Sequence, residues 1–494
     1  MAVIKNSTMY FSVSIFQSVL SFCLLPVFTF YLGTTEFGLA SLINSVAGLL
    51  GIFFIFGTQG VISRLYFEYK NDEEKMKKFL GTIFLSKLLW NIFLALLLII
   101  AKNQLFPIIA KGVDFNPYLL IAIGIGFFNT LFVLYQTLQQ TRQEGFKYSL
   151  LQIVYLIINN GITILLIVVF DMKAEGIVLG TLIADMLMTI FVFMRLRKEI
   201  IFTIEPSILK DAFGFSWPFL LQSLFAWGLA SINKLILNGL ISVEIVGVYS
   251  IGFIIAGIVN MASMALNRSY TPWFFSQMKK EDSSPKEIVR FSEFIILIYS
   301  IIALGLSLFG KDVVSLLLND AYGEAWVVIP FLSFAYVFNG LYSFFVNIFN
   351  YGRNSIKLLP LYSISAVLIN VVLNYLLIPS LGMVGSALAT LISMLVLSFV
   401  TYLGSKRYIN LGYNYLRMSS LIVLPFLMSL IVFVEFEWNQ WVTLILKGIY
   451  ALVCLITLYL INRKRFGSSL EKQRNNFKKY LGSIKNSYKN NKSN

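Results

Sequence analysis

Histidine is absent from this 494-residue chain, cysteine occurs only twice, and charged residues are scarce. The absence of histidine removes the commonest general base and the commonest neutral metal ligand. The two cysteines, Cys23 and Cys454, both lie inside apolar runs, where they form neither a disulfide framework nor a metal-ligand spacing. We therefore predict no catalytic residue, no metal and no cofactor, and we expect a protein that is not an enzyme.

Only 13% of the residues are charged and 58% are hydrophobic, whereas a soluble globular chain has roughly 25% charged residues. This composition excludes a set of soluble domains and predicts an all-α membrane protein. The first apolar run follows Met1 without an Ala-x-Ala-like cleavage site, so we expect it to be a retained helix. The net charge of +15 is explained by where the charges lie.

A helix needs roughly 20 apolar residues to cross the hydrocarbon core of a bilayer. About fourteen segments of the chain meet this requirement, two of them short. The predicted spans are Met9–Tyr31, Phe37–Ile62, Leu80–Ala101, Tyr118–Gln139, Leu150–Phe170, Ile177–Met194, Phe213–Leu240, Val246–Leu266, Phe294–Phe309, Trp326–Phe349, Leu358–Ile378, Val384–Leu403, Met418–Val434 and Val442–Ile461.

Lysine and arginine are distributed very unevenly between the two sides of these spans. Of the 39 lysines and arginines, thirty-two fall on the side of the termini, four on the other side and three within spans. Cytoplasmic loops carry the excess of basic residues, so both termini are predicted to be cytoplasmic. The positive charge is therefore a topological signature, and we predict no nucleic-acid partner. The basic tail 466–494 is expected to lie near anionic lipid.

Two pairs of segments match at the same offset of 209 residues. Gly38-Leu-Ala-Ser41 resembles Gly247-Val-Tyr-Ser250, and the segment 176–183 resembles the segment 385–392. Because this offset contains six predicted spans, an even number, the halves have the same orientation. We predict two parallel-related six-helix lobes around a central cleft, at 1–200 and 201–410, followed by two C-terminal helices at 411–465. Such an arrangement indicates alternating access.

Three segments carry a family resemblance. They are Asn233–Ser250, with its short turn before Gly247-Val-Tyr-Ser250, Phe30–Ser41 and Gly57–Glu68. Together with the number of spans and the repeat, they resemble the polysaccharide-biosynthesis transporters of the multidrug/oligosaccharidyl-lipid/polysaccharide exporter superfamily.

The resemblance implies a Wzx-like flippase in the bacterial inner membrane. Such a flippase moves undecaprenyl-diphosphate-linked sugar units from the cytoplasmic to the outer leaflet, for O-antigen (part of lipopolysaccharide), capsule or a related glycan. It also implies a cleft lined by cationic and polar groups, and as partners membrane lipid, an O-antigen polymerase and a chain-length regulator. A cationic lining is physically reasonable, because an unpaired anion in a low-dielectric interior is very costly.

Arg64 and Arg268 end the second and eighth predicted spans at the cytoplasmic face, at comparable places in the two lobes. A guanidinium group suits bidentate phosphate binding, and the resemblance implies that arginines in these helices bind the diphosphate. The alternative is anchoring of both side chains at the lipid headgroups.

Two ionisable residues lie deep within spans of the first lobe, where such a residue is a functional candidate by default. Lys87 lies about 10 Å into its span at 1.5 Å per residue, and it is a candidate substrate contact. Asp185 is nearly central in the sixth span and is a candidate for coupling to a cation or a proton. The structural alternative is an ion pair between Lys87 and Asp185.

Lys234 lies in the outer half of the seventh predicted span, beside Asn233. Lysines and arginines are rare on the outer side, and a buried lysine needs a partner. We predict that Lys234 binds a substrate phosphate. Glu244, which follows the next turn, and the outer headgroups are the structural alternatives.

Other functions remain open from the residues alone. A multidrug exporter of the same superfamily would need acidic residues in its cleft, whereas these spans hold three lysines and one central acid. A lipid II or teichoic-precursor flippase would carry the same diphosphate. A membrane glycosyltransferase or polymerase would usually have a large outward loop, and the outward loops here are short. No Gly-x-x-x-x-Gly-Lys-[Ser/Thr] motif occurs, which disfavours an ATP-driven mechanism.

Overall fold

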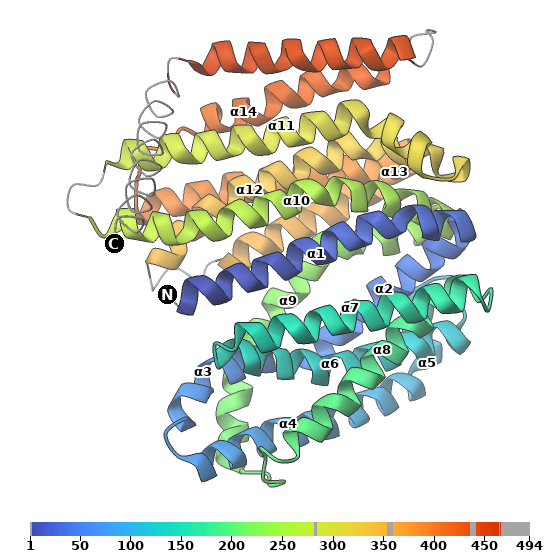
Figure 1. The fold of residues 1–494 in the computed structure, drawn as a ribbon, viewed down its shortest axis with the longest axis vertical. Helices are drawn as coiled ribbons and strands as arrows, with labels where there is room; N and C mark the ends of the chain where they lie inside the picture. The colour runs from blue at the N-terminus through green and yellow to red at the C-terminus, as the bar shows by residue number, and fades with distance from the viewer. Residues whose placement is uncertain (1, 281–283, 353–358, 435–440, 464, 466–494) are drawn as a thin grey trace, which may run out of the picture.

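The computed structural model describes residues 2–280, 284–352, 359–434, 441–463 and 465. Within these ranges the chain forms helices joined by short turns, and no β-strand (Figure 1). The predicted all-α class is confirmed. The predicted basic tail 466–494 lies outside the described residues.

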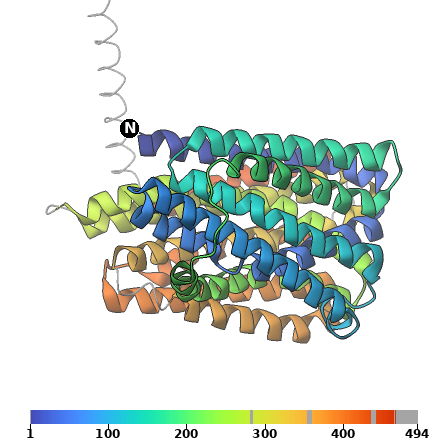
Figure 2. The same cartoon turned by 90° about the horizontal axis from the view of Figure 1, so that it is seen from below.

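Lobe 1 consists of the first helices of the chain, which lie side by side in the view of Figure 2. Its elements are α1 (Ala2–Tyr31), α2 (Thr34–Ile55), α3 (Thr58–Tyr69), α4 (Glu73–Ile100), α5 (Lys102–Ile109), η1 (Phe115–Leu119), α6 (Leu120–Thr141), α7 (Gly145–Val168) and α8 (Lys173–Leu196).

Lobe 2 follows after a short connection, and the C-terminal pair of helices packs on its far side (Figure 1). Its elements are α9 (Pro206–Leu240), α10 (Val243–Met278), α11 (Pro285–Leu317), η2 (Asp320–Val328), α12 (Ile329–Tyr351) and α13 (Leu359–Tyr408). The C-terminal pair consists of α14 (Tyr415–Ser429), continued by η4 (Leu430–Phe433), and the helix Trp441–Arg463. The division of the chain at residues 200, 410 and 465 stays a prediction.

The described residues contain 13 helices that are long and apolar enough to cross a membrane. One of them, α13, has 50 residues and would be about 75 Å long if it were straight. It reverses at Gly382, whose φ of 58° and ψ of −137° suit glycine. Tyr362 consequently lies against Gly404, which a straight helix would hold far apart. Because α13 consists of two helices that meet at Gly382, the described residues contain fourteen helical segments of this kind, which agrees with the predicted number.

The second predicted span is not one continuous helix. Phe56 and Gly57 both have left-handed backbone angles, with φ of 46° and 67°. The backbone hydrogen bonds of α2 end there, and α3 begins in a new direction. Arg64 therefore lies on a separate short helix, and not at the end of the long span on which the sequence pattern placed it.

Helices α9 and α1 each contact both lobes. The first part of α9 contributes Ile208 and Ala212 to a buried cluster of lobe 1, whereas Ile236 and Leu237 near its other end belong to the core of lobe 2. Helix α1 packs against α7 of lobe 1 and α10 of lobe 2. These two helices add to the direct contact between α2 and α10 that joins the lobes.

The outer surface of the bundle is apolar. On the C-terminal helix, for example, Trp441 is 75% exposed and Ile445 is 62% exposed. Large exposed apolar side chains over many helices are expected where lipid is the solvent. The chain is a multi-pass membrane protein.

Candidate functional site

Helix α2 of lobe 1 packs closely against α10 of lobe 2. A side chain at Gly38 would collide with the backbone of α10, and a side chain at Gly247 would collide with the backbone of α2. Just beyond, the hydroxyl oxygens of Ser41 and Ser250 are 2.8 Å apart and share a hydrogen bond. The 209-residue repeat makes Gly38 equivalent to Gly247 and Ser41 equivalent to Ser250. The axis that relates the lobes therefore passes between α2 and α10.

The same seam is closed at the ends of the helices that are predicted to face outside. The Thr34 hydroxyl donates to a carboxylate oxygen of Glu244 at 3.4 Å. The Tyr322 hydroxyl of η2 contacts the carbonyl oxygens of Gly33 at 2.9 Å and Leu32 at 3.1 Å. These contacts join the first turn of lobe 1 to lobe 2.

A cavity of about 360 Å³ lies next to this seam and receives side chains from both lobes. Lobe 1 contributes Ser41 and Asn44 from α2 and Asn160 from α7, and lobe 2 contributes Lys234 from α9. Its wall also includes Ser21 and Ile254, which line a second cavity of about 380 Å³ between α1 and α10. The cavities therefore adjoin.

Of the described residues that line the first cavity, Lys234 alone is charged. Its ammonium group donates a hydrogen bond to the Ser41 hydroxyl at 2.9 Å and lies 5.4 Å from the centre of the Phe253 ring. Among the described residues it forms no ion pair with a carboxylate. Glu244, the predicted structural alternative, contacts Thr34 instead. Lys234 thus has polar and aromatic partners but no counter-ion, and it faces a space that a ligand can enter.

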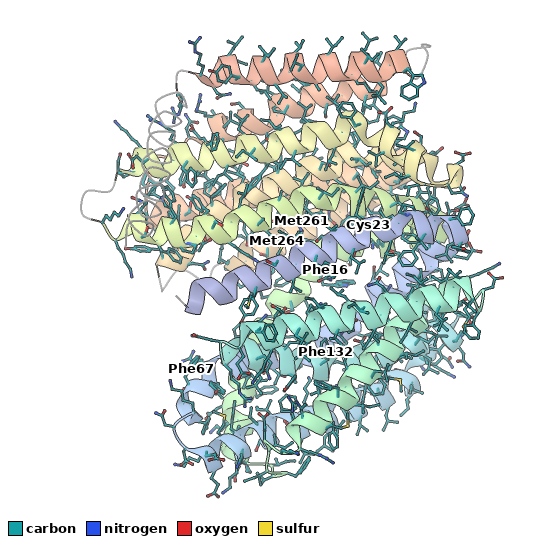
Figure 3. The ribbon with its side chains drawn as sticks, in the orientation of Figure 1. Phe16, Cys23, Phe67, Phe132, Met261 and Met264 are labelled. Atoms are coloured by element: carbon teal, nitrogen blue, oxygen red, sulfur yellow. The ribbon has the colours of Figure 1, made fainter. Side chains whose placement is uncertain are left out.

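Arg268 lies at the other end of the interlobe space. It lines a cavity of about 110 Å³ between α1 and α10, and its guanidinium group is 3.5 Å from the Ser14 hydroxyl. Figure 3 shows Met261 and Met264, which line the same cavity, on α10 beside α1. Arg64 is exposed on α3 and lines none of these three cavities. The two arginines lie on different lobes, and only Arg268 faces the space between them.

Lys87 is buried in lobe 1, where 4% of the residue is exposed. Its ammonium group has no hydrogen-bond partner in the part of the chain that the structure describes. On the next turn of α4, Asn91 donates to the carbonyl of Phe127 on α6. Lys87 lines none of the three cavities, so the structure does not bring it together with Lys234 and Arg268.

Asp185 is completely buried on α8. The Asn129 amide of α6 donates to one of its carboxylate oxygens at 2.9 Å. Tyr155 of α7 is a further polar neighbour of this carboxylate. The Asn159 amide in turn donates a hydrogen bond to the Tyr155 hydroxyl at 3.3 Å. No lysine or arginine forms an ion pair with Asp185 in the described ranges. The predicted alternative of an ion pair between Lys87 and Asp185 is therefore wrong.

Lobe 2 has a buried network of neutral amides in place of a buried central acid. Asn233, the neighbour of Lys234, donates to Thr390 at 2.7 Å and to the Tyr249 hydroxyl at 3.1 Å. Asn374 donates to the carbonyl oxygen of the Asn233 side chain at 2.9 Å. This network fixes the part of α9 from which Lys234 reaches into the cavity.

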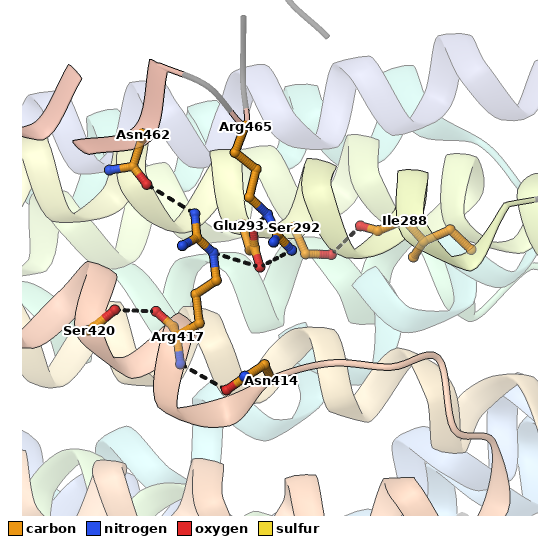
Figure 4. A network of polar contacts seen from close by, with 8 residues as sticks. All are labelled: Ile288, Ser292, Glu293, Asn414, Arg417, Ser420, Asn462 and Arg465. Carbon is orange, nitrogen blue, oxygen red and sulfur yellow. Dashed lines mark hydrogen bonds and ion pairs between the residues drawn. The ribbon is translucent and has the colours of Figure 1, made fainter. Parts of the chain in front are cut away.

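The sequence pattern gave no indication of one buried charge, Glu293 of α11, which is 0% exposed. Its carboxylate forms ion pairs with Arg465 at 2.7 Å and Arg417 at 3.3 Å (Figure 4). Arg417 also donates to Asn462 at 3.2 Å. This cluster joins both C-terminal helices to lobe 2. Near the other end of α11, Lys447 and Asp312 form a second ion pair, at 2.6 Å, away from the three cavities.

The model of the polysaccharide biosynthesis protein family matches residues 3–278, which is more than half of the chain. The chain belongs to this family. Its resemblance to the polysaccharide-biosynthesis transporters is therefore confirmed. This member of the polysaccharide biosynthesis family is 22% identical to "Lsg locus putative protein 1" of Haemophilus influenzae. The match covers 72% of this chain and 87% of that protein.

Solved structures share the fold of this polysaccharide biosynthesis family member. The lipid II flippase MurJ in an inward closed conformation superimposes with a TM-score of 0.67 at 16% identity, over 92% of this chain and 99% of that chain. An inward-facing multidrug resistance MATE family transporter of the MOP superfamily gives a TM-score of 0.57 at 16% identity, over 82% and 95%. The fold of this chain is thus a transporter fold like that of MurJ and the MATE transporters.

Proposed function

We propose that this protein is a flippase that moves an undecaprenyl-diphosphate-linked oligosaccharide across the bacterial inner membrane by alternating access. The observation that carries the proposal is the position of Lys234. A lysine without a counter-ion faces a cavity that both lobes line, next to the contact that holds the lobes together. An anionic group that entered the cavity would supply the missing negative charge.

The sign of the charge favours a diphosphate over a drug cation. The three interlobe cavities have Lys234 and Arg268 in their walls and, among the described residues, no carboxylate. A buried organic cation would lack a counter-charge there, which is costly. The multidrug exporter is therefore the weaker proposal. Lipid II and teichoic precursors carry the same diphosphate as an O-antigen unit. The charge of the cavities therefore does not separate these substrates, and only the preference of the protein for particular sugars would.

The other predicted residues receive separate roles in this proposal. Arg268 is proposed to bind the diphosphate at the cytoplasmic end of the groove, and both termini of the chain are proposed to lie in the cytoplasm. Arg64 on α3 is proposed to attract the substrate before it enters. Buried Asp185, with its amide and phenol neighbours, is the proposed site of coupling to a cation or a proton, and Lys87 is the proposed second anion contact in lobe 1. An O-antigen polymerase and a chain-length regulator are the proposed partners downstream.

Charge substitutions at Lys234 test the proposal. We expect Lys234→Arg to retain export of surface glycan in a flippase-deleted strain, Lys234→Ala to lose most of it, and Lys234→Glu to lose the most. A carboxylate at this position would repel the diphosphate. The measurement is surface glycan normalised to the amount of the protein in the membrane.

Lys111→Glu is the matched control, because Lys111 is exposed and lies outside the three cavities. It should leave export near the level of the unmodified protein. Normal export by the Lys234→Glu variant would contradict the proposal.

A further inference from the structure

The three interlobe cavities form one groove along α1. The cavity that contains Arg268 shares Ser18, Gly257 and Met261 with the middle cavity, and the middle cavity shares Ser21 with the cavity that contains Lys234. Along α1, the groove runs from Ser14 to Leu25 and beyond, which is about 16 Å at 1.5 Å per residue. A cation lies at each end of this length.

The wall between the two cations is polar but uncharged. Among the side chains that the structure describes, no aspartate, glutamate, lysine or arginine lines these cavities apart from Lys234 and Arg268. The polar side chains that face the groove carry hydroxyl and amide groups. They include Ser14, Gln17, Ser18, Ser21, Asn44 and Asn260.

Two of these amides are available to a ligand. Gln17 of α1 and Asn44 of α2 are both exposed, and both line the groove. The structure records no hydrogen bond from either side chain to the described part of the protein. An amide offers two donors and an acceptor that accepts twice, so each matches the hydroxyl groups of a sugar ring.

A charged sugar would fit this groove poorly. A carboxylate or ammonium group that leaves water without meeting an opposite charge is destabilised, and the two cations lie at the ends, where the diphosphate needs them. A neutral sugar meets hydroxyl and amide groups that replace its bonds to water. From these observations we infer that the glycan unit is uncharged, and that its hydroxyl groups lie along α1 between Lys234 and Arg268. This inference rests on the proposed function.

The test measures how tightly the purified full-length chain in detergent binds three ligands. They are undecaprenyl diphosphate, the same carrier with a neutral oligosaccharide, and the same carrier with one uronic acid in that oligosaccharide. We expect the neutral glycan to lower the dissociation constant about tenfold relative to the bare carrier, about 1.4 kcal/mol. We expect the uronic acid to remove this gain.

Substitutions then locate the sugar. Gln17→Leu and Asn44→Leu should each reduce the gain from the neutral glycan at least threefold and leave binding of the bare carrier unchanged. Gln104→Leu, at an exposed position on α5 away from the groove, is the matched control and should keep the full gain.

The outcomes separate the inference from the proposal on which it rests. Equal binding of the bare carrier and the neutral glycan would overturn the inference and leave the diphosphate flippase intact. Tighter binding of the uronic acid form would also overturn it. Failure of all three ligands to bind would overturn the proposed function together with the inference.

Discussion

The most deeply buried charged residues of the two lobes have opposite surroundings. In lobe 2, Glu293 is surrounded by two arginines, and the central polar groups are neutral amides. In lobe 1, Lys87 has no partner and Asp185 has only neutral neighbours within the described residues. A buried charge with ion-pair partners, such as Glu293, has a structural role, because its ion pairs connect parts of the fold. An uncompensated charge within a membrane is costly, so lobe 1 retains two residues that the stability of the fold does not explain.

The largest expected effect tests the compensated side of this comparison. Glu293→Ala leaves Arg417 and Arg465 without a counter-charge at the base of the C-terminal pair. Loss of one partner of a buried ion pair costs about 3–5 kcal/mol, and we expect about 2–3 kcal/mol here because both arginines are partly exposed. The measurement is the midpoint of thermal unfolding of the purified protein.

Glu68→Ala is the control for Glu293→Ala, because Glu68 is exposed on α3. It should change the midpoint little. An equal loss in both variants would mean that the ion pairs of Glu293 do not stabilise the C-terminal pair.

The next effect has the opposite sign. Lys87→Met removes a buried charge without a partner and keeps an unbranched apolar side chain. Insertion of a lysine near the membrane centre costs about 2.5–3.5 kcal/mol, so we expect a gain on the order of 2 kcal/mol in stability. Glycan export should fall at least tenfold. Lys198→Met, at an exposed position, should change neither quantity. Loss of stability in Lys87→Met would show that an unseen partner compensates this lysine.

Asp185→Asn should separate stability from coupling. Asparagine keeps the oxygen that accepts from Asn129, so we expect the unfolding midpoint to change by less than about 1 kcal/mol in free energy. Export should become slow and insensitive to the cation or proton gradient, because the ionisable group is gone. Asp171→Asn, in an exposed turn, is the matched control. Normal gradient-dependent export by Asp185→Asn would exclude this residue from coupling.

A modest effect on stability is expected at the seam between the lobes. Ser41→Ala removes the hydrogen bonds to both Lys234 and Ser250, whereas Ser250→Ala removes one bond on the equivalent side of the axis. We expect losses of about 1–2 kcal/mol for Ser41→Ala and about 1 kcal/mol for Ser250→Ala. Thermal unfolding of the two variants gives the difference. Identical losses would mean that the bond to Lys234 adds no stability.

Local patterns in the sequence predicted the spans, and the repeat predicted which residues are equivalent. The spans and the repeat both depend on short apolar or glycine-containing segments, so they can be recognised without knowing which residues are in contact in the fold. The reversal at Gly382 was predicted as a boundary between two spans for the same reason. The contact between Ser41 and Ser250 was not predicted, because it depends on how the lobes meet.

The two errors in the sequence analysis have the same cause, because both concern contacts between side chains on different helices. Glu293 was overlooked because it lies just before a predicted span, and its two arginines come from helices more than a hundred residues later. Lys87 and Asp185 lie in the same lobe, but they do not form an ion pair. The roles of Arg64, Lys87, Lys234, Arg268 and Asp185 in transport stay predictions.

The contacts of Gly38 with Gly247 and of Ser41 with Ser250 join positions that the repeat makes equivalent. If a single lobe associated with a second copy around the same axis, each of these residues would meet its own counterpart, as in an isologous homodimer interface. A fused chain keeps such an interface and is free to change one copy alone. The counterpart of Lys234 at the 209-residue offset is Leu25. One half of the seam thus carries a charge that the other half lacks, so the two halves need not contribute equally to transport.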